Sequence, residues 1–597
     1  WLPWAFEACL LKGRSNYLSL RRWRRYLAEP CREADELRFK LKILVWLNQT
    51  STGDRSELRL QGSDEVFWAR IASDPLDCVG VRCTSEDCYV HRAREEAESA
   101  DLIVVNHALL LADAVQGGAI LPHYEHLVVD EAHHMEEAAT QGLRQEVDGP
   151  GLLALLERLA GSGGERGLIE QLVAEPDLFT ADVGLEEAAG LAVAARSRAE
   201  ELFEAAWDWV RSTIGERDES VRLTPAVKKG PQWERLRERG EDGLTALAAL
   251  EVKLRRAVAA GREWLPGDEP DQGLRELDVI RGRLQEAAGL VREAVAEPDP
   301  NRVTWFQVLA RAPALTLRSV PLDVGGLLRE HVFEGRGSVV LTSASLAVGG
   351  TFDYFLSRVG LSGRDVETLI LASPFDYLRQ ALVCLPSGLP EPQSPEFAGA
   401  LAEVVSDVVS KIEGRTLALF TSHRQLRETC WALKQRRDLD SILILAQGVD
   451  GPRRQVLRAF AESERALLLG TASFWEGIDL PGDQLSCVVM ARLPFPVPSD
   501  PVFAARAEMV RDPFRNYALP LAALRLKQGF GRLIRRGTDR GAVVILDARI
   551  SSRDYGRAFL EVLPPASRFQ GPAGEVGARV REWLGMPELR SGSPAGA

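Results

Sequence analysis

The stretch that decides the fold is His126-Leu127-Val128-Val129-Asp130-Glu131-Ala132-His133. Its apolar residues predict a buried strand, and two adjacent carboxylates follow at the end of that strand. Open parallel sheets bind their ligands just beyond the carboxyl ends of the strands. One carboxylate there can hold Mg²⁺ through water, while its neighbour polarises an attacking water molecule. The stretch therefore indicates a magnesium nucleotide site; the simpler alternative is a strand end followed by an acidic helix cap.

Similar short apolar runs occur in two regions of the chain and alternate with helical patterns, which is typical of parallel sheets built from strand and helix units. In the first region the predicted strands are 102–105, 127–129 and, far downstream, 339–341. In the second region they are 416–420, 466–469, 487–490 and 542–546. The sequence therefore predicts two α/β domains.

Length and charge narrow the class of protein. The 597 residues exceed what one hydrophobic core supports, so several domains are expected. The chain has neither an apolar run long enough to span a bilayer nor the features of a signal peptide at its start, so a cytoplasmic location is expected. With 73 basic and 86 acidic residues the net charge is −13, so nucleic acid has to be bound by a local basic groove.

A different pattern separates the early strands from residues 339–341. From about Gly149 to Asn301 the chain is rich in Ala, Leu, Glu and Arg at helical spacing, most clearly at 152–159, 185–210 and 244–258. We interpret this region as a helical insertion, and it contains no catalytic motif. The final residues are rich in Gly, Ser, Pro and Ala, which predicts a disordered tail.

Polar segments follow several predicted strands in a fixed order. They are Thr342-Ser343-Ala344-Ser345-Leu346, Thr421-Ser422-His423, the run from Gly470 to Gly482, and Gln528-Gly529-Phe530-Gly531-Arg532-Leu533-Ile534-Arg535. With the Asp-Glu-Ala-His box, these segments resemble motifs II to VI of the superfamily 2 DNA helicases of the DinG type, which are related to XPD. Residues 11–18, 104–110 and 373–376 also resemble DinG sequences.

The resemblance implies two RecA-like α/β motor domains with parallel sheets, the first interrupted by an iron-sulfur domain and by a helical arch. The expected boundaries are 1–18 for a remnant of motor domain 1, 19–100 for the cysteine-bearing insertion, 101–148 for motor domain 1 with its Asp-Glu-Ala-His box, 149–312 for the arch, 313–372 for the continuation of motor domain 1, 373–586 for motor domain 2 and 587–597 for a disordered tail.

The resemblance also implies roles for single residues. Asp130 would engage Mg²⁺, Glu131 would act as general base, and His133 would link the nucleotide site to the rest of the motor. The remaining catalytic residues would be Gln528 and two arginine fingers, Arg532 and Arg535, whose planar guanidinium groups suit phosphate oxygens. Nucleotide coupling would involve Ser343, Glu476, Gly477 and Asp479. The expected contacts to the nucleic-acid backbone are Thr421, Ser422 and Thr471. Trp475 would either stack on a base or lie buried.

Three cysteines in the spacing Cys78-x4-Cys83-x4-Cys88 resemble the iron-sulfur insertion of DinG and XPD relatives. A [4Fe-4S] cluster takes four thiolates, and Ser19 stands where the family has the remaining cysteine. The fourth ligand would be Ser19 or Cys31, or the cluster would be labile or lost. The alternatives are zinc held with His91, and buried thiols without a metal.

A second group in this region combines arginines with aromatic rings. Arg21, Arg22, Arg24 and Arg25 alternate with Trp23 and Tyr26. This pattern indicates either a strip for single-stranded DNA or a solvated basic helix face.

The 597 residues lack the motif G-x-x-x-x-G-K-[ST], which cradles nucleotide phosphates and which in the family lies upstream of residues like 11–18. We therefore expect the chain to be truncated at its N-terminus and to hydrolyse little ATP as written.

The parent protein is expected to be a monomeric ATP-dependent helicase that moves 5′ to 3′ on single-stranded or forked DNA in repair or replication. The alternatives are an RNA helicase of the Asp-Glu-Ala-His class, a fusion with an upstream nuclease, and a non-catalytic nucleic-acid-binding or scaffold protein.

Overall fold

The computed structural model describes residues 4–31, 33–60, 62–74, 88–162, 165–174, 185–214, 219–264, 272–308, 314–475 and 484–587. The chain divides into two compact units. The first comprises Trp1–Val128 with His134–Val340, and the second Val129–His133 with Leu341–Ala597. The Asp-Glu-Ala-His box therefore groups with the second unit. Of the predicted disordered tail, residues 588–597 lie outside the described residues.

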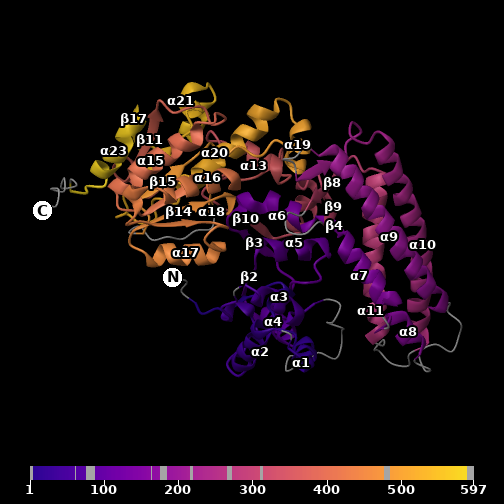
Figure 1. Cartoon of the computed structure of the whole chain (residues 1–597). Helices are drawn as coiled ribbons and strands as arrows, with labels where there is room; N and C mark the ends of the chain where they lie inside the picture. The colour runs from indigo at the N-terminus through magenta and orange to yellow at the C-terminus, as the bar shows by residue number, and fades with distance from the viewer. Residues whose placement is uncertain are drawn as a thin grey trace, which may run out of the picture. The chain divides into compact units, whose positions relative to one another are not determined.

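The second unit is built on a seven-stranded sheet in which all neighbouring strands are parallel (Figure 1). The strand order is β13-β14-β12-β15-β16-β11-β17. The strands are β11 (Ala381–Ser387), β12 (Thr416–Leu419), β13 (Leu443–Ala446), β14 (Ala466–Gly470), β15 (Cys487–Met490), β16 (Gly541–Ile545) and β17 (Ser567–Pro572). The four strands predicted here are confirmed to within one residue at each end, whereas β11, β13 and β17 were not predicted.

Alternating side chains of this sheet face two separate apolar layers, as a parallel sheet covered on both faces requires. On β15, Val488 and Met490 pack into one layer and Cys487 and Val489 into the other. The first layer is completed by α17 (Arg453–Glu462), α20 (Leu519–Phe530) and α22 (Gly556–Val562). The second is completed by α15 (Phe397–Lys411), α16 (His423–Lys434) and α23 (Val576–Trp583).

The first region of predicted strands forms two short ladders. β1 (Ala8–Leu10) pairs in parallel with β2 (Leu102–Val104), and β3 (His126–Val129) pairs with β10 (Ser338–Leu341). The predicted strands 102–105, 127–129 and 339–341 are thus confirmed to within one residue. In the described part of the chain, however, β2 and β3 belong to separate sheets. The pairing of β3 with β10 joins segments that lie on either side of the helical insertion.

The helical character predicted for the region from about Gly149 to Asn301 is confirmed, and the region also contributes strands to a sheet that was not predicted. Five of its helices pack around a shared apolar core: α7 (Gly149–Ala160), α8 (Leu168–Val173), α9 (Leu185–Thr213), α10 (Pro231–Trp264) and α11 (Gln272–Val295). Figure 1 shows the three long helices α9, α10 and α11 lying side by side. An antiparallel sheet in the order β4-β9-β8-β7 joins them, formed by Gln145–Asp148, Leu315–Pro321, Arg302–Val308 and Ser220–Arg222. The insertion therefore is not purely helical.

The N-terminal helices correct the interpretation of the basic strip. They are α1 (Leu20–Ala28), α2 (Ala34–Leu47), α3 (Asp64–Ile71) and α4 (Tyr89–Ser99). Trp23 and Tyr26 are buried in the core that α1 to α3 share, so neither ring can stack on a base. Arg21, Arg24 and Arg25 are exposed on the opposite side of α1, which matches the solvated basic face. No helix in the described segments has both the length and the hydropathy needed to cross a membrane.

Candidate functional site

The Asp-Glu-Ala-His box forms a strained turn at the end of β3. Glu131 has a φ of +49°, in the left-handed region that side chains other than glycine rarely adopt. Its backbone N–H donates to Oδ1 of Asp130 at 2.9 Å. Such a conformation costs about 1–3 kcal/mol and persists where the surroundings over-determine it, often at functional sites. The strain therefore marks the two carboxylates as a candidate site.

Glu131, His133 and Ser343 meet in one hydrogen-bonded group. Ser343 Oγ donates to Glu131 Oε2 at 3.1 Å and lies 2.7 Å from His133 Nδ1. His133 Nδ1 is also 3.3 Å from Glu131 Oε2. The backbone supports the group, because the N–H of Ala132 donates to the carbonyl of Thr342 at 3.0 Å. Three residues that the sequence singled out separately are thus joined in one network.

Two further predicted residues, Gln528 and Arg532, make hydrogen bonds to the segments that follow two different strands. Gln528, in α20, donates from Nε2 to Ser345 Oγ at 3.4 Å, two residues from Ser343. Arg532 donates from Nε to the carbonyl of Trp475 at 3.1 Å. Gln528 therefore lies beside the segment that follows β10, while this contact of Arg532 ties it to the segment that follows β14.

The loop that carries Arg535 is held by two residues that sequence reasoning missed. Asp539 Oδ2 accepts from the backbone N–H groups of Arg535 and Arg536, both at 2.8 Å. Gln380 Nε2 lies 3.1 Å from the carbonyls of Arg536 and Gly537 and 2.9 Å from that of Asp539. Gln380 and Asp539 are both buried. Because Gln380 precedes the loop by more than 150 residues, no local signal in the sequence connects them.

The predicted nucleic-acid contacts differ in accessibility. Thr421 and Ser422 are half-buried beyond the end of β12, and Ser422 Oγ caps α16 by accepting from the N–H of Gln425 at 3.4 Å. Thr471 is buried; its hydroxyl donates to Gln447 Oε1 at 2.9 Å and lies 3.3 Å from His423 Nε2. Gln447 and His423 were not predicted as site residues.

Trp475 lies in the core. Its exposed fraction is 4%, and its ring packs among the apolar side chains beneath the sheet. Its Nε1 donates to the carbonyl of Phe420 at 3.4 Å. Of the two interpretations of Trp475, the structure shows the buried aromatic.

Several predicted residues lie outside the described residues: Cys78, Cys83, Glu476, Gly477 and Asp479. Among the described residues, no group of three or more His, Cys, Asp or Glu side chains is arranged to hold a metal ion. Cys88 directly precedes α4, and Cys31 is exposed. Ser19 is the N-cap of α1, where its Oγ accepts from the N–H of Arg22 at 3.3 Å. The Ser19 oxygen therefore already has a structural role.

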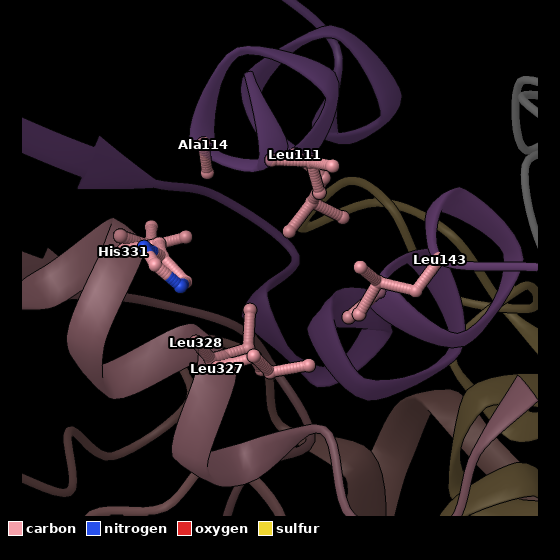
Figure 2. A pocket seen from close by; sticks show the side chains of 9 residues that line it. Leu111, Ala114, Leu143, Leu327, Leu328 and His331 are labelled. Atoms are coloured by element: carbon pink, nitrogen blue, oxygen red, sulfur yellow. The ribbon is translucent and has the colours of Figure 1, made fainter. Parts of the chain in front are cut away.

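A cavity of about 130 Å³ lies beside the helix that follows the Asp-Glu-Ala-His box. Leu111 and Ala114 of α5 (His107–Val115), Leu143, and Leu327, Leu328 and His331 point toward it (Figure 2). This lining is apolar apart from the His331 imidazole, so the cavity offers no donors suited to a triphosphate.

Comparison with known proteins places these features in a family. Residues 405–566 match the family described as the helicase C-terminal domain. The chain is 33% identical to the ATP-dependent DNA helicase YoaA of Escherichia coli, with 99% of this chain and 86% of that protein covered. It is 31% identical to the ATP-dependent helicase DinG of Mycobacterium tuberculosis, with 94% and 81% covered.

A third relative is longer. The chain is 32% identical to the protein named 3′-5′ exonuclease DinG of Bacillus subtilis, with 97% of this chain covered but 64% of the relative's length.

The fold has a solved counterpart. An XPD helicase structure aligns with a TM-score of 0.50 at 13% identity, covering 95% of this chain and 87% of that one. The sequence identity extends over most of this chain and most of the E. coli and M. tuberculosis proteins. It therefore shows membership of the same family and not only a similar fold. The chain belongs to the family of DinG and YoaA ATP-dependent helicases.

Proposed function

We propose that this chain is the motor of an ATP-dependent DNA helicase that translocates 5′ to 3′ along single-stranded DNA. The observation that carries the proposal is the hydrogen-bonded group of Glu131, Ser343 and His133. A general base for ATP hydrolysis needs a carboxylate held in one orientation, and Ser343 and His133 both contact the Glu131 carboxylate. The names of the YoaA relatives support DNA over RNA as the substrate.

In the proposed reaction Asp130 engages the Mg²⁺ that accompanies ATP, and Glu131 accepts a proton from the attacking water. Arg532 and Arg535 neutralise charge on the transferred phosphoryl group, with Gln528 lining the same cleft. The bond from Ser343 to both Glu131 and His133 gives the segment after β10 a direct way to sense the state of the nucleotide. Closure and reopening of the cleft would then move the DNA strand.

The proposed DNA path follows the carboxyl ends of the strands in the second unit. Thr421 and Ser422 are accessible enough to contact phosphates, and Glu476, Gly477 and Asp479 would couple this path to the nucleotide. Because Thr471 is buried against Gln447 and His423, we assign it a supporting role. Contacts of this kind follow the backbone without reading bases, so low sequence specificity and strong salt dependence are expected.

We also propose a [4Fe-4S] cluster held by Cys78, Cys83 and Cys88. Thiolates are the ligands such clusters take, and Cys88 at the start of α4 is half-buried and carries no disulfide. Because Ser19 Oγ already caps α1, Cys31 is the better candidate for the fourth ligand. Iron and sulfide analysis of anaerobically purified protein should give four of each per chain, about the cubane stoichiometry. Cys31→Ser should lower the content and Ser19→Ala should not; the reverse pattern would assign Ser19.

The domain boundaries, the cellular location and the oligomeric state are part of the same proposal. The domain boundaries are those expected from the sequence, from the insertion at 19–100 and the arch at 149–312 to the second motor domain at 373–586. The setting is the cytoplasm, where a monomer would act on forked DNA in repair or replication.

The decisive experiment is Glu131→Gln in the protein as the cell makes it, including any residues that precede Trp1. The variant should bind single-stranded DNA with unchanged affinity but lose ATP turnover by several orders of magnitude, because only the proton acceptor is removed. Full turnover in the variant would contradict the proposed role of Glu131. Duplexes with a single 5′ or 3′ tail test the direction, and competition between RNA and DNA for ATPase stimulation tests the RNA alternative.

A further inference from the structure

Arg492, at the carboxyl edge of the seven-stranded sheet, has no carboxylate partner among the residues that the structure describes. It lies two residues beyond β15, which is flanked by β12 and β16. Its Nη2 donates to the carbonyl of Pro392, and its Cζ lies 5.2 Å from the centre of the Phe397 ring. Its Nε is buried and has no hydrogen-bond partner within the described residues. A carbonyl and a ring orient the guanidinium but do not neutralise its charge.

One of the two acids that act on Arg492 is already paired with another arginine. Asp547 is fully buried, and Arg549 binds it with both ends of its fork, Nε to Oδ1 at 2.8 Å and Nη2 to Oδ2 at 2.6 Å. Asp547 Oδ2 also accepts from the N–H of Leu493 at 3.0 Å. Asp547 therefore holds the backbone next to Arg492 in place, but its ion pair is with Arg549.

The other acid that acts on Arg492 is paired as well. Glu428 accepts from Arg424 Nε at 2.8 Å, in the helix that Ser422 caps. The two carboxylates that act on Arg492 are thus each hydrogen-bonded to another guanidinium, Asp547 to Arg549 and Glu428 to Arg424. Burial, and then repulsion by Arg549, lower the pKa of Arg492, against the opposing effect of Asp547 and Glu428. An anion at this point would relieve that repulsion.

We propose that Arg492 binds a phosphodiester group of single-stranded DNA. The inference rests on the proposed function and extends the path of Thr421 and Ser422 by one strand, because β15 is the neighbour of β12 and adjacent strands lie about 4.8 Å apart. Ligands of open parallel sheets bind at this edge. A half-buried guanidinium held in place by Pro392 and Phe397 suits the paired oxygens of a phosphate better than it suits a base.

The first experiment measures the salt dependence of binding to an oligothymidylate by fluorescence anisotropy. Arg492→Gln should weaken binding about tenfold, and the slope of log affinity against log salt should fall by about 0.7 because one phosphate contact is lost. Arg492→Lys keeps the positive charge and should keep the slope. The matched control is Arg465→Gln: Arg465 precedes β14 at the opposite edge of the sheet and already pairs with Glu413 at 3.0 Å. Its slope and affinity should equal those of the parent.

A second measurement needs no variant and therefore does not depend on how Arg492→Gln folds. Phenylglyoxal modifies accessible arginines, and mass spectrometry reports each site. Oligothymidylate should protect Arg492 in the parent protein, whereas ATP or ADP alone should not; protection by nucleotide alone would overturn the proposal by assigning the site to nucleotide phosphate.

The outcomes separate the two proposals. If the parent binds the oligonucleotide but Arg492 is not protected and folded Arg492→Gln keeps the parent slope, this inference is wrong and the proposed function stands. If the parent protein does not bind DNA at all, the proposed function itself fails.

Discussion

His133 and Ser343 are separated by 210 residues, yet Nδ1 of His133 lies 2.7 Å from Oγ of Ser343. The contact depends on the pairing of β3 with β10. The whole helical insertion lies between these two strands in the sequence. A change at Ser343 should therefore reach both the carboxylate that we propose as general base and the histidine beside it.

Ser343→Ala should lower DNA-stimulated ATP turnover about tenfold, equivalent to about 1.4 kcal/mol, because Glu131 and His133 lose their shared partner. Steady-state ATPase assays with and without single-stranded DNA check this, in the protein as the cell makes it. Ser343→Thr retains the hydroxyl and should recover most of the rate. Equal turnover in the alanine variant and the parent would show that the contact has no catalytic consequence.

Gln380→Leu should destabilise the second unit by about 2–3 kcal/mol, because it leaves the carbonyls of residues 536 and 537 and the buried carbonyl of Asp539 without their donor. The control is Gln435→Leu, since Gln435 is exposed at the end of α16 and should change stability by less than about 0.5 kcal/mol. Urea unfolding followed by circular dichroism measures both. Similar values for the two variants would mean that Gln380 does not hold the loop.

Trp475 and Trp431 form a matched pair for testing burial. Trp475 is 4% exposed and Trp431 is 69% exposed. Trp475→Ala should lower the free energy of unfolding by about 3–5 kcal/mol, and Trp431→Ala by about 0.5 kcal/mol or less. Chemical denaturation of both variants gives the comparison. A small loss for Trp475→Ala combined with a large loss of DNA affinity would restore the stacking interpretation.

Cys384 should make the second unit sensitive to alkaline pH. Burial raises the pKa of its thiol to about 12. Since an unfolded cysteine ionises near pH 8.5–9, roughly the reference value, the unfolded state loses its proton first and folding stability falls as the pH rises from about 9 toward 12. Below that range the thiol is protonated in both states and its contribution is constant.

Cys384→Ala should therefore reduce the fall in unfolding free energy by about 1.4 kcal/mol per pH unit above pH 9. The difference between variant and parent should be constant between about pH 6 and 8, where no thiol titrates. Urea unfolding at a series of pH values supplies both comparisons. Parallel curves for the two proteins above pH 9 would contradict a raised pKa.

Local patterns predicted most of the strands that build the site. Residues 127–129, 466–469 and 487–490 are apolar runs followed by polar residues, and burial on both faces of a parallel sheet requires such runs. The strand β17, in contrast, contains Arg568 and Gln570 at an edge of the sheet, so its sequence lacks the continuous apolar character of the central strands. The strand β8 has alternating and aromatic residues that do signal a strand, but it lies within a region dominated by helical patterns.

The sequence by itself determined the fold class and the order of the strand ends, and it predicted Asp130, Glu131, Ser343 and the two arginines as site residues, because each is a local pattern beside a predicted strand. The tertiary structure alone decided which groups share a hydrogen bond and which lie in the core. Gln380 and Asp539 hold one loop, Thr471 and Trp475 are buried, and Arg492 contacts Pro392 and Phe397, all through contacts between residues distant in the chain. Hydrogen bonding and burial depend on distance in space. For residues that are about a hundred or more positions apart, their spacing along the sequence does not predict that distance.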